Sequence, residues 1–458
     1  MTDAQKKHLI RIVEESLARV NPYDMIRSSV SLEGSTLTID TETAHDSVDL
    51  DMFTRIVVIG TGKAAAPMAR AIEDILGDRV TDGVVSVKRG HLDSLRTVRL
   101  IEAGHPVPDD QSVAAGREIL ELAQGGDRST LFLILVSGGG SALLEAPLQA
   151  VIDGKPIELT LEDIQQTTRG LLDSGATIQE VNTVRKHLSA IKGGRLAEAL
   201  APAHSVSLIL SDVVGDSFDS IASGITAPDP STFGDALDCI KKYGIADRLP
   251  PAVLRVLRAG ADGAVAETPK PGAEAFRLVQ NVLVGTNYQA LLAATSAAAS
   301  LGYETLLLTS RLTGEAREAA GFLASVIAEI RTHDRPVHVP ACLLCGGETT
   351  VTVRGTGGGG RNQELALAMI DEMTREPELY RNTAFVSAAT DGTDGPTDAA
   401  GAFASPEIAV KARRSGLDCR AYLADNDSYR FFDTIGELLR TGPTNTNVCD
   451  IQVALISE

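Results

Sequence analysis

The strongest constraint on the fold is a unit that recurs along the chain. In it, a short apolar run is followed by a loop of glycine, serine or aspartate and then by a helical stretch. The apolar runs lie at residues 56–59, 131–136, 207–210, 282–284 and 305–308. Continuous apolar runs without alternation are typical of strands buried on both faces, as in parallel sheets covered by helices. The pattern therefore predicts an α/β protein with largely parallel sheets.

Two changes in composition and residue pattern along the chain predict the domain organisation. Prolines are frequent over residues 226–275, where one short stretch near 234–243 has a helical pattern, and this composition indicates a transition between domains. Threonine, valine and arginine alternate from Thr349 to Val353, which predicts an antiparallel strand pair and hence a mixed second sheet. We expect an N-terminal domain over 1–240, a linker over 241–275 and a smaller α/β domain over 276–458.

Charge and cysteine usage exclude several classes of protein. The chain has 42 lysine and arginine residues against 61 aspartate and glutamate residues, a net charge of −19, which argues against nucleic-acid or membrane partners. Five cysteines in 458 residues exclude a disulfide scaffold and favour a reducing compartment. Residues 4–20 have the period of an amphipathic helix, ended by Asn21-Pro22, rather than of a signal peptide. We expect a cytoplasmic protein, with a homodimer as one option that the sequence leaves open.

Three glycine-containing loops are candidates for anion binding. The first, Gly60-Thr61-Gly62-Lys63-Ala64-Ala65, follows a strand and opens a helix. It fits a variant of the dinucleotide fingerprint. The next strand ends in Lys88-Arg89 rather than in a carboxylate, so NADP remains an option and NAD is disfavoured. A Walker A loop is excluded because Ala64 lacks the magnesium-binding hydroxyl. A lysine at a helix start that binds an anion and a plain strand–helix turn both remain open.

The other two loops give stronger signals. Ser137-Gly138-Gly139-Gly140-Ser141 follows a buried strand, and its successive amides and two hydroxyls predict an anion-binding nest more than a flexible turn. In the segment Gly355 to Glu364, Gly358, Gly359 and Gly360 precede Arg361 at a helix start near residue 364. This arrangement predicts a phosphate cradle with a fork-shaped cation, in preference to a flexible hairpin tip.

Acidic loops supply candidate magnesium ligands. Asp391 and Asp394 follow a strand that ends at Thr390, and Asp212 follows the strand at 207–210. Magnesium takes one or two carboxylates together with phosphate oxygens, although aspartate is also an ordinary turn former. An EF-hand does not fit the spacing of Asp391 and Asp394, because the twelfth position is Ala402.

Three further features remain balanced between a functional and a structural interpretation. The break between Lys192 and Arg195 would suit a small carboxylate, although most cations of this segment fit a solvated helix face. His105 fits a structural loop residue better than a ligand contact. Cys342 and Cys345 have zinc-like spacing, but no second Cys/His pair accompanies them, so we expect buried strand thiols.

Together these loops resemble those of the type-2 glycerate kinases, whose C-terminal part is known as the MOFRL domain. The resemblance covers nearly the whole chain and keeps the order of the motifs. The matching stretches are Gly60 to Ala64, Gly104 to Asp109, Ser137 to Ser141, Asn182 to Gly194, Ser211 to Asp216, Gly346 to Glu348, the glycine-rich loop to Glu364, Asp391 to Thr397 and Thr444 to Asn447.

The resemblance implies ATP-dependent phosphorylation of D-glycerate, usually to 2-phosphoglycerate, with Mg²⁺, in a cleft between a Rossmann-like domain and a smaller α/β domain. It implies that Lys63 and Arg361 are catalytic cations and that Asp212 and Asp391 are carboxylates of the same cleft. We expect Asp212 to orient or deprotonate the substrate hydroxyl, and Asp391 and Asp394 to hold Mg²⁺. The expected substrate- or phosphate-binding residues are Gly62, Ser137, Gly138, Gly139, Gly140, Ser141, Lys192, Arg195, Gly358, Gly359, Gly360, Asn445 and Asn447.

Two alternatives compete with the kinase. An NAD(P)H-dependent hydroxypyruvate reductase would explain the first glycine loop but leaves the loops around Arg361 and Asp391 without a role. A non-catalytic module that binds phosphorylated metabolites would explain the anion nests but not the acidic loops beside them. Phosphoryl transfer needs positioning and charge neutralisation, which all of these loops can provide.

Overall fold

The computed structural model describes residues 1–42 and 44–458, which form two compact units. Unit 1 comprises residues 1–21, 212–215 and 285–458, and unit 2 comprises residues 22–211 and 216–284. This division differs from the predicted boundaries at 240 and 275. Helix α1 (Asp3–Arg19) packs on α11 (Asn287–Ser300), so the N-terminal 21 residues belong with the C-terminal part of the chain.

Unit 2 is built on a six-stranded sheet with the order β6–β5–β4–β7–β10–β11. Its strands are β4 (Arg55–Thr61), β5 (Asp82–Lys88), β6 (Arg99–Ala103), β7 (Thr130–Val136), β10 (His204–Leu210) and β11 (Val279–Gly285). The pairs from β6 to β10 are parallel. The chain starts in the middle, builds one side and then returns to build the other, which is the doubly wound Rossmann order. The predicted α/β class and the parallel sheet are confirmed.

Short elements cover this sheet. Helix α3 (Ala65–Leu76) packs on β4, β5 and β7, and α4 (Asp110–Gln124) packs on β5 and β6. Helix α5 (Gly140–Leu143) packs on β5, whereas α2 (Pro22–Ser29) packs on α3 and α8 (Arg195–Leu200) packs on α4. A small antiparallel sheet precedes β4 and consists of β1 (Val30–Glu33), β2 (Thr36–Asp40) and β3 (His45–Asp49).

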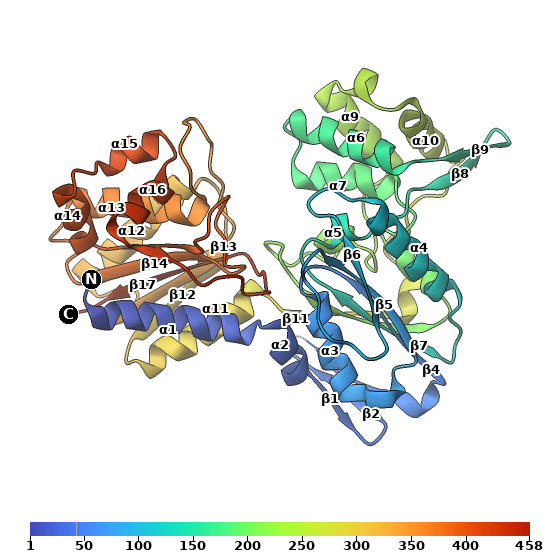
Figure 1. The fold of residues 1–458 in the computed structure, drawn as a ribbon, viewed down its shortest axis with the longest axis horizontal. Helices are drawn as coiled ribbons and strands as arrows, with labels where there is room; N and C mark the ends of the chain where they lie inside the picture. The colour runs from blue at the N-terminus through green and yellow to red at the C-terminus, as the bar shows by residue number, and fades with distance from the viewer. Residues whose placement is uncertain (43) are drawn as a thin grey trace. The chain divides into compact units, whose positions relative to one another are not determined.

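A helical lobe completes unit 2 (Figure 1). It consists of α6 (Leu161–Asp173), α7 (Ile178–His187), α9 (Phe233–Tyr243), α10 (Pro251–Ala261) and the hairpin of β8 (Gln149–Ile152) and β9 (Lys155–Glu158). These elements share one apolar core that includes Leu171, Phe233 and Val253. The region expected as a linker over 241–275 therefore contains a packed helix. Pro250 and Pro251 do not mark a linker, because Pro250 is the N-cap of α10 and Pro251 begins this helix instead of breaking it.

Unit 1 is built on a mixed six-stranded sheet with the order β12–β13–β17–β14–β15–β16. The strands are β12 (Glu304–Leu312), β13 (Ala341–Gly347), β14 (Thr383–Ala389), β15 (Gly401–Ala404), β16 (Leu438–Leu439) and β17 (Asp450–Ile456). Only β12 and β13 pair in parallel. Figure 1 shows α1 and α11 on one face of this sheet and α12 (Ala316–His333) and α13 (Arg361–Arg375) on the other. The remaining helices of the unit are α14 (Pro406–Arg414), α15 (Cys419–Ala424) and α16 (Ser428–Ile435).

The strand pair expected at residues 349–353 does not form, and this expectation is wrong. Thr350 forms an isolated parallel bridge with Glu315. The Thr352 amide and hydroxyl donate to the Glu315 carboxylate at 3.1 and 2.7 Å. The Glu315 side chain therefore takes the Thr352 hydrogen bonds, and the Thr350 amide donates to the Gly314 carbonyl at 2.8 Å, so no neighbouring antiparallel strand is present among the described residues.

No helix within residues 1–42 and 44–458 combines the length and apolar character that a membrane span requires.

Candidate active site

The strand order of unit 2 identifies where a ligand would bind. In a doubly wound sheet, ligands bind at the carboxyl ends of the strands where the order reverses. This point lies between β4 and β7, which are adjacent and parallel. Residues 62–64 follow β4, and residues 137–141 follow β7 and include the first two residues of α5. The topology thus brings together Lys63 and the triple-glycine loop, which the sequence analysis selected separately.

Hydrogen bonds fasten these two loops to each other. The Lys63 amide donates to the Gly138 carbonyl at 2.9 Å, and the Ala64 amide donates to Oγ of Ser137 at 3.0 Å. Gly62 has a φ of +133°, and a Cβ atom there would lie 2.1 Å from Oγ of Ser137. Only glycine fits at this approach, so Gly62 has a steric role and Ser137 joins the two loops.

The two loops leave several hydrogen-bond donors free. Among the described residues, no acceptor takes a hydrogen bond from the amides of Gly138, Gly139 or Ser141. The Lys63 ammonium likewise forms no ion pair with any residue of 1–42 or 44–458. Unpaired amides beside a cation are groups suited to binding an anion.

Two histidines add to this site, one of which the sequence analysis set aside. Nδ1 of His91 lies 3.1 Å from the Lys63 carbonyl oxygen. A Cβ atom at Gly139 would lie 3.0 Å from Cδ2 of His105 and 3.4 Å from Cε of Lys63, so both side chains lie against this glycine. Burial, followed by the charges of Lys63 and Lys88, lowers the pKa of His105 to about 4. His105 is therefore neutral at pH 7, and its position directly after β6, at the carboxyl edge of the sheet, was the signal that sequence reasoning missed.

A strained turn supports the far end of the glycine loop. Ala222, Ser223 and Gly224 have consecutive left-handed φ values of +48°, +57° and +64°. Such residues cost free energy outside glycine. Oγ of Ser141 and Oγ of Ser223 are 2.8 Å apart, and the Ser223 hydroxyl also donates to Oδ1 of Asn182 at 3.3 Å. The Ser141 hydroxyl is thus held by its contact with Ser223, which lies in this turn.

Lys192 and Arg195, expected to bind substrate, are engaged within the protein. Lys192 is fully buried and forms an ion pair with the buried carboxylate of Glu145. Burial lowers the pKa of Lys192 to about 8, and Glu145 opposes this shift. Nη2 of Arg195 donates to the Ala266 carbonyl at 3.0 Å. These contacts favour a structural role for both cations.

The second group of candidates lies in unit 1, at one edge of the mixed sheet. Nε and Nη2 of Arg361 donate to the two oxygens of Asp450 at 2.6 and 3.0 Å, and Nη1 donates to Glu348 at 2.6 Å. Asp450 is completely buried, whereas the Glu348 side chain is 44% exposed. Burial alone would lower the pKa of Arg361, but Asp450 and Glu348 raise it. Arg361 is thus a cation anchored by one buried carboxylate and by a second that solvent can reach.

The glycine-rich loop before Arg361 is braced by the chain that follows it. Both oxygens of Asp394 accept from the start of α13, Oδ1 from the Asn362 amide at 3.0 Å and Oδ2 from the Gln363 amide at 2.8 Å. A Cβ atom at Gly360 would lie 2.3 Å from Cγ of Asp394, and one at Gly359 would lie 2.1 Å from Oγ of Ser428. In the part of the chain that the structure describes, the amides of Gly359 and Gly360 have no acceptor. They remain free for an anion at a helix N-terminus.

The remaining candidates lie in the same unit. Oδ1 of Asp391 accepts from the Thr393 amide at 3.0 Å. The Asp212 carbonyl oxygen accepts from Sγ of Cys449 at 3.2 Å, which places the 212–215 segment beside the start of β17. Asn447 accepts from the Cys449 amide at 3.1 Å, and Asn445 is exposed with a φ of +60°. Within residues 1–42 and 44–458, no three histidine, cysteine, aspartate or glutamate side chains gather as a metal site would require.

Comparisons with known proteins agree with this division of functional groups. Residues 8–258 match a domain of unknown function, DUF4147, and residues 341–450 match the MOFRL family. The fold and the two family matches thus define a two-part α/β protein of the DUF4147–MOFRL class.

Full-length relatives make the assignment more specific. A glycerate 2-kinase of Pyrococcus horikoshii is 39% identical over 98% of this chain and 96% of its own length, and a D-glycerate 2-kinase of Thermotoga maritima is 41% identical over 99% of both chains. A crystal structure of glycerate kinase from Thermotoga maritima matches with a TM-score of 0.84, at 40% identity over 99% of this chain and 100% of that one. An Agrobacterium vitis relative, 43% identical over 88% of this chain and 87% of its own, carries a hydroxypyruvate reductase name. The chain belongs to the glycerate 2-kinase family.

Proposed function

We propose that this protein is an ATP-dependent glycerate kinase that converts D-glycerate to 2-phosphoglycerate. The relatives named glycerate 2-kinase, which match over nearly the whole chain, support the reaction class. The observation that carries the proposal is the unpaired Lys63 ammonium beside the free amides of Gly138, Gly139 and Ser141, at the strand-order reversal of the sheet. A transferring phosphoryl group needs such donors, because little covalent chemistry is required of the protein.

We assign Lys63 and Arg361 to the phosphoryl group. The sequence resemblance implies this role for both cations. Arg361 would keep its two hydrogen bonds to the buried Asp450 and exchange the more exposed Glu348 for phosphate oxygens. Asp212 is the carboxylate that we propose to orient or deprotonate the glycerate hydroxyl.

Asp391 and Asp394 are the two carboxylates to be weighed as magnesium ligands. Mg²⁺ usually binds through one or two carboxylates and substrate phosphates, not a full protein cage, so the lack of a three-residue cluster in the described chain is compatible with it. Asp391 is the carboxylate that we propose for the metal, which when bound would neutralise charge on the phosphates. Both carboxylate oxygens of Asp394 accept hydrogen bonds from backbone amides of α13, so we no longer propose Asp394 as a magnesium ligand.

Phosphorus NMR of a mixture of the protein, D-glycerate, ATP and Mg²⁺ tests this proposal. We expect ADP and a 2-phosphoglycerate resonance to appear, with none when L-glycerate replaces the D form. We also expect Lys63→Met and Arg361→Gln to reduce kcat by at least about 10³, as for other cations that stabilise phosphoryl transfer. Lys155→Met, on the exposed β9 strand, is the matched control.

Other results of these assays would each indicate a different product or function. A 3-phosphoglycerate resonance would correct the position of transfer and leave the kinase intact. Oxidation of NADPH by hydroxypyruvate, without glycerate-dependent ADP formation, would establish the reductase instead. Stabilisation by ATP without turnover would indicate the non-catalytic binding module. The cytoplasmic location and the homodimer expected from the sequence stay predictions.

A further inference from the structure

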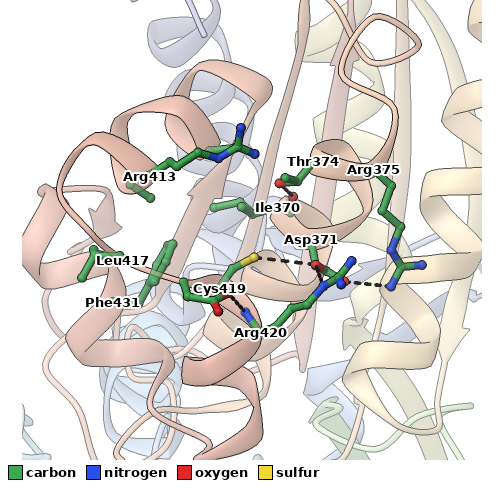
Figure 2. A pocket seen from close by; sticks show the side chains of 12 residues that line it. Ile370, Asp371, Thr374, Arg375, Arg413, Leu417, Cys419, Arg420 and Phe431 are labelled. Atoms are coloured by element: carbon green, nitrogen blue, oxygen red, sulfur yellow. Dashed lines mark hydrogen bonds and ion pairs between the residues drawn. The ribbon is translucent and has the colours of Figure 1, made fainter.

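A cavity of about 430 Å³ lies in unit 1 among α13, α14, α15 and α16 (Figure 2). Neither the sequence motifs nor the proposed reaction use it. Its volume falls within the range of small-molecule sites. Ile370, Leu417 and Phe431 give it an apolar lining, and Ile370 and Phe431 are buried at 1% and 0% exposure.

The cavity carries three arginines that differ in their partners. Arg375 and Arg420 both bind the Asp371 carboxylate, each at 2.7 Å, so this carboxylate compensates part of their charge. Arg413 also lines the cavity, and no carboxylate within the described residues forms an ion pair with its guanidinium. Figure 2 shows Arg413 on the opposite side of the cavity from the Asp371 network. The lining thus holds three arginines and two carboxylates, Asp371 and Asp418, and Arg413 is the cation of this lining that has no carboxylate partner among the described residues.

The combination of one unpaired guanidinium and an apolar wall favours one type of anion. A guanidinium fork accommodates the two oxygens of a carboxylate in parallel hydrogen bonds. A phosphate dianion would call for more unpaired cations than Arg413 alone. The Cys419 thiol adds no covalent chemistry, because burial and then the Asp371 charge raise its pKa to about 11.

The walls of the cavity also hold the glycine-rich loop. Helix α13 lines the cavity with Asp371 and Arg375 and begins at Arg361, roughly 15–21 Å away along its axis at 1.5 Å per residue. Helix α16 contributes Phe431 to the cavity, and its Tyr429 amide donates to the Gly358 carbonyl at 3.0 Å. The residue after α15, Asp425, accepts from the Gly357 amide at 2.9 Å. A ligand that shifts α15 or α16 would therefore act on residues 357–360 through direct contacts.

We propose that this cavity binds a small organic carboxylate with a compact apolar body, and that its occupancy changes the mobility of the 357–360 loop. The proposal goes beyond the proposed reaction and does not depend on it. An effector site of this kind would act on the 357–360 loop from outside the loop itself.

Ligand-observed NMR with benzoate tests the binding step on the full chain. We expect saturation transfer to benzoate, little to the neutral benzamide, and an affinity for benzoate at least about tenfold weaker in Arg413→Gln, as for a lost hydrogen bond to a charged group. Arg414→Gln is the matched control, because Arg414 is the next residue of α14, is exposed and lies outside the cavity lining. Benzoate held at the loops of unit 2 would not respond to Arg413→Gln. Equal binding by that variant and the wild type would therefore overturn the site, as would equal binding of benzamide.

Hydrogen exchange tests the coupling step. We expect benzoate to change amide exchange over residues 355–360 in the wild type and in Arg414→Gln but not in Arg413→Gln. Because exchange needs no substrate, failure of the kinase assay would leave this test unaffected. Binding that depends on Arg413 but leaves exchange at 355–360 unchanged would overturn the coupling.

Discussion

Lys63 and Arg361 were selected from the same kind of motif, but the structure places them differently. Within residues 1–42 and 44–458, the Lys63 ammonium has no ion pair, whereas Arg361 has three hydrogen bonds to two carboxylates. A cation without an internal partner is free for a ligand, and one that is held by carboxylates is oriented but partly neutralised. The sequence shows the residue type and the helix start, but it cannot show Asp450, which lies 89 positions away.

The contact of His105 with Lys63 gives a prediction that needs no turnover. The NMR titration of His105 should give a pKa of about 4 in the wild type. Lys63→Met should raise this pKa toward the ordinary value, because the Lys63 charge is the second cause of the shift after burial. Lys155→Met, on β9, should leave it unchanged. A His105 pKa that is identical in Lys63→Met and the wild type would contradict the placement of these side chains against Gly139.

The lowered pKa of His105 also makes the free energy of unfolding depend on pH. Between pH 4 and 6.5 the unfolded chain binds a proton at His105 that the folded chain does not, so the free energy of unfolding rises with pH across this window. The contribution is complete above pH 6.5 and is lost as the pH falls to 4. Denaturant unfolding of His105→Asn at several pH values should therefore show a smaller slope over this window than the wild type.

At the scale of elements, the sequence predicts where loops follow strands, but it does not predict which distant side chains form hydrogen bonds or ion pairs with them. The apolar runs at 56–59 and 131–136 lie within β4 and β7, and the loop that contains Lys63 and the triple-glycine loop follow directly. The helix expected from residue 364 begins at Arg361 instead, because Asp394, 31 positions beyond Gln363, supplies the acceptors for its first amides. The pairing of Lys192 with Glu145 was missed for the same reason, since the two residues lie 47 positions apart. The local hydrophobic pattern therefore predicts that a helix or strand exists, whereas its exact start depends on a hydrogen-bond partner that is distant in the sequence.

Replacing Asp394 should distinguish a helix cap from a metal ligand. Asp394→Ala leaves the buried amides of Asn362 and Gln363 without acceptors, so we expect the free energy of unfolding to fall by roughly 1–3 kcal/mol. Asp394→Asn keeps one side-chain oxygen and should cost less. Denaturant unfolding measures both.

The matched comparison is Asp391→Asn. We expect that variant to raise the Mg²⁺ concentration needed for half-maximal activity with little change in stability. Asp394→Asn should leave the magnesium requirement unchanged. The reverse result, a stable Asp394→Asn variant with a raised magnesium requirement, would show that Asp394 is a magnesium ligand after all.

At the scale of the whole molecule, composition predicts two parts but not which residues belong to each. The chain passes between the units at residues 21/22, 211/212, 215/216 and 284/285. Proline content suggested a boundary near 240, yet the proline-rich region folds into the helical lobe, and the first helix packs on the C-terminal sheet. Packing of this kind depends on which apolar faces meet, and an amphipathic pattern in residues 4–20 does not specify its partner.

The position of α1 gives a prediction for the entire chain. Leu9 and Ile12 of α1 are both fully buried, and this helix contacts α11, β14 and β17 of unit 1. Leu9→Ala and Ile12→Ala should each cost about 2–5 kcal/mol, as for other cavity-forming substitutions. Hydrogen exchange of the double variant should show lost protection in β14 and β17 and unchanged protection in β4 and β7. Lys7→Ala, on the exposed face of the same helix, should leave all four strands protected. Equal loss of protection in β4 and β7 would mean that α1 stabilises unit 2 as well, contrary to the contacts that assign it to unit 1.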